Sequence, residues 1–207
     1  FAESRTSYFH KSVGGYHPAK LRIYQDVIER YLSVQHPGVL NMLNAKYFVA
    51  QDPQTKQPTF FRNDLTYGSC WLVKHVIGVD GRAAALQALD STNLKDTAIV
   101  ENTLMKSVTP PQWDSASSIR MTKFDNDAIE YEANCTGPQF AVFSEVYYPA
   151  GWNAYIDGKK TAYVNTNYVL RGLSVPAGKH TIRFAFEPAS YKKGSSVSFI
   201  ASILILL

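Results

Sequence analysis

The segment WNAYIDGKKTAYVNT, residues 152–166, has the pattern of two short strands joined by a tight turn. Asp157 and Gly158 stand between Ile156 and Lys159, and an Asp-Gly pair between β-favouring residues is a strong signal for a two-residue hairpin loop. Such a loop needs positive φ angles, which glycine adopts without steric cost. The segment therefore predicts an antiparallel hairpin.

Similar strand-like runs lie on both sides of this hairpin. They are separated by turn residues and spaced about 8–12 residues apart, which is typical of a sandwich or barrel. In the last run, His180, Ile182, Phe184 and Phe186 share one face. The runs are SIRMTKF, AIEYEANC, PQFAVFSEVYY, WNAYIDG, KKTAYVNT, YVLRGLSVPAG and KHTIRFAFEP. They predict an antiparallel β-sandwich, jelly-roll or immunoglobulin-like, over residues 116–190.

The chain before this region mixes helical and strand patterns. Pro18 and Pro37 each suit the first position of a helix. The patterns are helical at residues 18–32, 37–44 and 81–91, and strand-like at residues 45–50, 69–79 and 97–101. We therefore predict a small α/β unit over residues 1–108, a Pro-rich linker at 109–115, and an α+β class for the whole chain.

The composition is that of an ordered globular protein, because 13% of the residues are aromatic and only 18% are charged. The net charge of +4 is spread along the sequence, so we expect no nucleic-acid partner. Cys70 and Cys135 lack the spacing of a zinc or redox motif. They either form a disulfide in an oxidising compartment or remain two separate buried thiols.

The chain ends on an uncharged stretch, GSSVSFIASILILL, residues 194–207. A buried terminal strand or helix is one interpretation. The favoured one is the start of a truncated transmembrane helix, since a complete span needs about 20 apolar residues and this run supplies about half. Lys192 and Lys193 would then lie at the membrane surface.

Motifs of catalysis are missing from the sequence. It contains no phosphate-binding glycine loop, no HExxH and no GxSxG, and its five histidines lack ligand spacing, so we predict no catalytic residue, no metal and no cofactor. Glu130 and Glu132 could suit glycoside hydrolysis, but alternation places both on a solvent face.

Two aromatic-rich stretches remain, residues 7–20 and residues 144–164. Their Tyr, Trp, His and Lys side chains around glycine turns could bind a glycan or a sugar-phosphate headgroup, with Tyr16, His17, Lys20 and Trp152 as the candidate ligand-binding residues. The alternative is that these aromatic rings pack the core and its flanks.

The same stretches carry a resemblance to a known family. The segment SEVYYPAGW (residues 144–152) and the IDGK of residues 156–159 resemble the C-terminal part of YfhO-type bacterial membrane proteins. So do the later residues Arg171-Gly172, the VPAG of residues 175–178, and His180. Ala150 departs from the usual spacing of that motif.

The resemblance implies a polytopic membrane protein related to lipid-linked-sugar glycosyltransferases that act on cell-envelope polymers. This chain would be a non-catalytic domain on the extracytoplasmic side of the bacterial cell membrane, because the catalytic carboxylates of such enzymes lie in membrane loops outside it. Its partners would be the membrane-embedded part of the same protein and an envelope glycan or lipid-linked sugar. A secreted carbohydrate-binding module and a hydrolase with an unrecognised site are the alternative functions.

Overall fold

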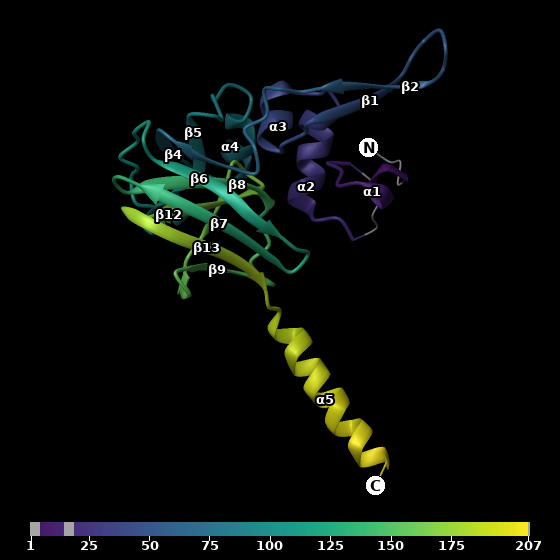
Figure 1. Cartoon of the computed structure of the whole chain (residues 1–207), viewed down its shortest axis with the longest axis vertical. Helices are drawn as coiled ribbons and strands as arrows, with labels where there is room; N and C mark the ends of the chain where they lie inside the picture. The colour runs from purple at the N-terminus through teal and green to yellow at the C-terminus, as the bar shows by residue number, and fades with distance from the viewer. Residues whose placement is uncertain (1–4, 15–18, 207) are drawn as a thin grey trace.

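Two antiparallel sheets form the largest part of the structure, a computed structural model that describes residues 5–14 and 19–206 (Figure 1). The five-stranded sheet has the order β10 (Lys159–Thr161), β9 (Trp152–Ile156), β13 (Gly178–Phe186), β7 (Ala128–Cys135) and β6 (Ser118–Phe124). The four-stranded sheet has the order β11 (Val164–Thr166), β12 (Leu170–Val175), β8 (Gln139–Val146) and β3 (Cys70–Val73).

The hairpin predicted at Asp157-Gly158 joins β9 to β10, with Ile156 paired to Lys159. Asp157 and Gly158 both have positive φ angles, 51° and 79°. This is the backbone that a two-residue primed turn requires, so the hairpin is confirmed.

The four-stranded sheet is largely buried on both faces, which explains why β3 and residues 140–143 of β8 are continuous apolar runs. One face packs against the five-stranded sheet through residues such as Phe143 and Leu173. The other face packs against helices through residues such as Phe140 and Leu170. The two sheets form a β-sandwich, and a helical layer covers the outer face of the smaller one.

The helical layer contains most of the remaining elements. They are α1 (Arg5–Phe9), α2 (Arg22–Val27), the π-helical segment η1 (Ile28–Leu32), α3 (Pro37–Met42), α4 (Gly81–Ala88) and the 3₁₀ segment η2 (Asn102–Ser107). Strands β4 (His75–Val79) and β5 (Thr97–Glu101) pair in parallel beside α4. Strands β1 (Tyr47–Gln51) and β2 (Pro58–Arg62) form a hairpin that projects from the body (Figure 1).

These elements confirm the α+β class with an antiparallel sandwich and correct three details. Residues 69–79 form two strands, β3 and β4, in different sheets, because Lys74 and His75 both donate backbone hydrogen bonds to the Asp96 carbonyl between them. Residues 159–166 likewise divide between the two sheets as β10 and β11. The first long helix begins at Arg22, whereas Pro18 lies outside the described residues.

The C-terminal stretch is helical, as predicted, but its helix α5 (Ala189–Leu206) begins before residue 194. It projects away from the sandwich (Figure 1). Within residues 5–14 and 19–206, no helix combines the length and the apolar character that crossing a bilayer requires.

Candidate functional site

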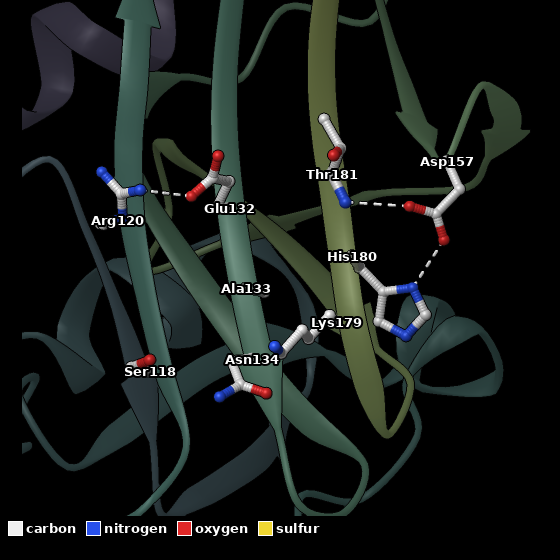
Figure 2. Close-up of a pocket in the computed structure, with 9 residues that line it drawn as sticks. All are labelled: Ser118, Arg120, Glu132, Ala133, Asn134, Asp157, Lys179, His180 and Thr181. Carbon is white, nitrogen blue, oxygen red and sulfur yellow. Dashed lines mark hydrogen bonds and ion pairs between the residues drawn. The ribbon is translucent and has the colours of Figure 1, made fainter.

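A polar groove of about 380 Å³ lies on the outer face of the five-stranded sheet (Figure 2). Neighbouring residues on β6, β7 and β13 supply its floor, since Ser118 pairs with Asn134 and Lys179 pairs with the same Asn134 from the other side. The turn between β9 and β10 supplies one wall through Asp157. The lining residues are Ser118, Arg120, Glu132, Ala133, Asn134, Asp157, Lys179, His180 and Thr181.

His180 and Asp157 form a hydrogen-bonded pair at this groove. The His180 Nδ1 atom lies 2.6 Å from Asp157 Oδ2, and its Nε2 atom lies 3.1 Å from the Ala177 carbonyl oxygen. Both neighbours are acceptors, so the ring satisfies both contacts only when it carries two protons. The hydrogen bond to Asp157 accordingly raises the pKa of His180.

Asp157 also fixes the backbone of β13. Its Oδ1 atom accepts a hydrogen bond of 2.9 Å from the Thr181 N–H, and its own N–H donates to the Thr181 carbonyl at 2.9 Å. The hydrogen bonds from His180 and Thr181 lower the pKa of Asp157. The ion pair and these hydrogen bonds therefore link the β9–β10 turn to β13. We call this contact the His180–Asp157 latch.

The other charged groups of the groove are paired or point to solvent. Arg120 forms an ion pair with Glu132 across β6 and β7. Glu132 and the partly exposed Glu130 both lie on the solvent face, as alternation predicted. The groove offers hydrogen-bonding groups of both charges, and its lining residues include no Phe, Tyr or Trp ring for sugar stacking.

The His180–Asp157 latch predicts a specific pH dependence of stability. Because the pKa of His180 is raised in the folded state, protonated His180 stabilises the fold fully at pH values below its ordinary pKa of 6.5. This stabilisation is lost as the pH rises through the raised pKa of the folded state. The lowered pKa of Asp157 contributes above its ordinary value of 3.8 and is lost as pH falls through the lowered value. Asp157→Asn should therefore lower the urea midpoint most between about pH 4 and 6.5.

The effect should be small, because the Asp157 side chain is half exposed and its charge is screened. The control is Asp64→Asn, which removes an exposed carboxylate that pairs with Arg62. A loss of stability in Asp157→Asn that stays constant from pH 5 to 9 would contradict a protonated His180.

Trp152, the one candidate ligand-binding residue in the sandwich, begins β9 and is partly buried. Its ring packs against Phe186 with centroids 5.4 Å apart, and the Arg171 guanidinium lies 4.2 Å from its centroid. These contacts bury part of the Trp152 ring, and the ring lies outside the polar groove.

Lys20, another candidate, precedes the helix α2 and is not part of the sandwich. Its side chain is partly buried. Tyr16 and His17 lie outside the described residues. A ligand site that combines these residues stays a prediction.

Cys70 and Cys135 are free thiols in this structure. Burial raises the pKa of the Cys70 thiol to about 11, so it is unreactive at neutral pH. Among residues 5–14 and 19–206, no group of three or more His, Cys, Asp or Glu side chains could hold a metal ion.

Two constellations were not identified as sites from the sequence. Asp157 and His180 are 23 positions apart and meet only through the register of β9 and β13. Glu145, Arg171 and Trp152 gather at one end of the sandwich. All five belong to the segments on which the family resemblance rests, and that resemblance is the signal that could have grouped them.

Comparisons with known proteins agree with the resemblance. The model of the family described as bacterial membrane protein YfhO matches residues 87–198, which is more than half of the chain. No curated protein and no solved structure matches significantly. The matched region includes the groove, Trp152, Arg171 and most of the sandwich.

Proposed function

Because the chain belongs to the YfhO family of bacterial membrane proteins, we propose that it is a non-catalytic extracytoplasmic domain of a multi-pass membrane protein. The parent protein is related to lipid-linked-sugar glycosyltransferases that act on cell-envelope polymers. In this proposal the domain packs on the membrane-embedded part and helps to position an envelope glycan or a lipid-linked sugar.

The exposed apolar surface of α5 is the observation that carries this proposal. Val197 and Phe199 are 66% and 67% exposed, and Ile200 and Ile203 are also exposed. At 100° per residue these four side chains lie within about 160° of the helix circumference and form one broad apolar face. Because the family is one of membrane proteins, lipid is available to cover these apolar side chains. We therefore propose that α5 enters the bilayer and continues as a membrane helix in the parent protein.

The polar groove favours a second candidate, a secreted carbohydrate-binding module. Ser118, Asn134 and Thr181 present hydroxyl and amide groups beside the charged Arg120 and Lys179, and sugars bind through such groups. A secreted module leaves the exposed apolar surface of α5 unexplained, so the membrane-attached domain is the better proposal.

The proposed sidedness predicts where a surface tag is accessible. An epitope inserted in the exposed turn between β1 and β2, at Thr55, should bind antibody on intact protoplasts that express the full-length parent protein. The tagged protein should also stay with the membrane fraction after an alkaline wash, because α5 and its continuation are held by apolar burial.

A cytoplasmic protein with the same epitope is the control, and it should bind antibody only after the membrane is permeabilised. Labelling of the Thr55 insertion only after permeabilisation would refute the extracytoplasmic placement. Release of the full-length protein into the medium would favour the secreted module.

A further inference from the structure

The polar groove lies at the end of the five-stranded sheet that is farther from α5. Strand β13 begins at Gly178, beside the groove, and ends at Phe186, three residues before α5. Lys179 of the groove pairs near the end of β7, whereas Ala185 pairs with Ala128, the first residue of β7. At about 3.4 Å per residue, the groove is about 24 Å from the end of β13 that leads into α5.

Six side chains form the floor of the groove as two rows across three strands (Figure 2). Paired residues of β13, β7 and β6 supply each row, so neighbours within a row are about 5 Å apart. The rows are Lys179, Asn134 and Ser118, then Thr181, Glu132 and Arg120. All six residues are exposed, so a ligand reaches them from solvent without any movement of the fold.

Two ion pairs neutralise most of the charge in the groove. Arg120 pairs with Glu132, and protonated His180 pairs with Asp157. Lys179 has no ion-pair partner within 4.0 Å in the described parts of the chain. One positive charge is therefore left over, and a ligand with one negative charge complements it.

The floor also presents hydrogen-bonding groups that the fold leaves unused. The side chains of Asn134, Ser118 and Thr181 form no hydrogen bond with another described residue. The Asn134 amide donates and accepts, and so does each hydroxyl group. Sugar hydroxyls have the same double capacity, so a sugar matches this floor better than an apolar ligand does.

We propose that the groove binds a sugar that carries a carboxylate. The Lys179 ammonium and the Asn134 amide are neighbouring donors, and each holds one carboxylate oxygen. The ring hydroxyls bond to Ser118, Thr181 and the free carboxylate oxygen of Glu132. A phosphate is the poorer match, because phosphate recognition uses clusters of cations and only Lys179 is unpaired here.

The distance between the groove and α5 selects the source of this sugar, provided that α5 enters the bilayer as proposed above. The headgroup region adds only about 5–8 Å to each side of the hydrocarbon core. A groove about 24 Å from the start of α5 lies beyond that layer. The sugar therefore belongs to an acidic polysaccharide of the envelope rather than to a lipid carrier.

An NMR titration of the purified full chain with a tetramer of galacturonic acid tests the groove. A polyoxyethylene detergent covers α5 without adding sugar or charge. The amide signals of Ser118, Asn134 and Lys179 should shift, and the methyl-esterified tetramer should bind at least about threefold more weakly because it lacks the charge. Equal binding of the acid and the ester, or no shift with either, would overturn the proposal.

Lys179→Gln tests the carboxylate contact, and the exposed position lets the fold persist. This variant should bind the acid about three- to tenfold more weakly and bind the ester as the wild type does. The matched control is Lys160→Gln, which removes an exposed lysine of β10 outside the groove and should leave binding unchanged. Equal weakening in both variants would mean general attraction to a basic surface and would contradict a site at Lys179.

A tetramer of glutamic acid tests the class of the ligand. It carries the same number of side-chain carboxylates as the acidic sugar but has no hydroxyl groups, so it should bind at least about threefold more weakly. Equal or tighter binding of the peptide would assign the groove to acidic peptides instead.

A nitroxide on the lipid headgroup tests the source of the sugar in nanodiscs. It should broaden the amide signals at the start of α5 and leave those of Asn134 and Lys179 sharp. Broadening at Asn134 would place the groove at the membrane surface and refute a polysaccharide remote from the lipid. The sugar titration itself does not depend on sidedness, so a cytoplasmic placement would refute the proposed function and leave the titration unchanged.

Discussion

Phe184→Ala should lower the free energy of unfolding by about 3–5 kcal/mol, the range for removal of a buried phenylalanine ring. Phe184 is fully buried between the two sheets. Its ring centroid lies 5.0 Å from that of Phe143 and 5.4 Å from that of Tyr163, and its face also contacts the Arg171 guanidinium. Chemical denaturation with fluorescence and circular dichroism measures the loss.

The matched control is Phe60→Ala on the projecting β1–β2 hairpin, where the ring is 68% exposed. This variant should change the free energy of unfolding by less than about 0.5 kcal/mol. Similar losses in the two variants would mean that Phe184 does not lie in the centre of the sandwich.

Asn167→Ala should be the second most damaging change, with a loss of about 2–4 kcal/mol. Asn167 follows β11 and joins the sandwich to β5 of the parallel pair. Its side-chain Oδ1 atom accepts a 2.9 Å hydrogen bond from the Ile99 N–H, and its own N–H donates to the Ile99 carbonyl at 2.8 Å. The variant leaves the buried Ile99 N–H unsatisfied and places alanine at a φ of 48°.

Asn165→Ala, two residues earlier and only partly buried, is the control and should cost much less. Amide hydrogen exchange gives a second measurement. Exchange at Ile99 should accelerate in Asn167→Ala and stay slow in the control. Unchanged protection of the Ile99 amide would show that another group accepts its hydrogen bond.

Alternation predicted the sandwich strands well, because the pattern is local. The bounds of β6 and β7 coincide with the predicted runs, and every second residue of β7 is apolar and buried. The junction between β3 and β4 was missed, since the cause is a pair of hydrogen bonds to Asp96, more than twenty residues away. Local patterns cannot contain such a partner.

The candidate site depended even more on distant contacts. A turn was predicted at Asp157, but its meeting with His180 follows from the register between β9 and β13. Arg171 stands in the sequence LRGL as an ordinary polar position of a strand. It alternates with Leu173 and Val175 on the face of β12 that packs between the two sheets, where the Phe184 ring covers it, and a single charged residue among apolar ones does not reveal that contact.

The place of β3 in the four-stranded sheet has a consequence for synthesis of the chain. The ribosome produces β3 about seventy residues before β8, the strand with which it pairs and in which Phe143 lies opposite Cys70. The five-stranded sheet is completed later still, because β13 pairs with both β7 and β9 and follows them in the chain. A nascent chain released before β13 therefore leaves the five-stranded sheet divided, and the unpaired edges of β7 and β9 expose apolar surface to aggregation and to chaperones.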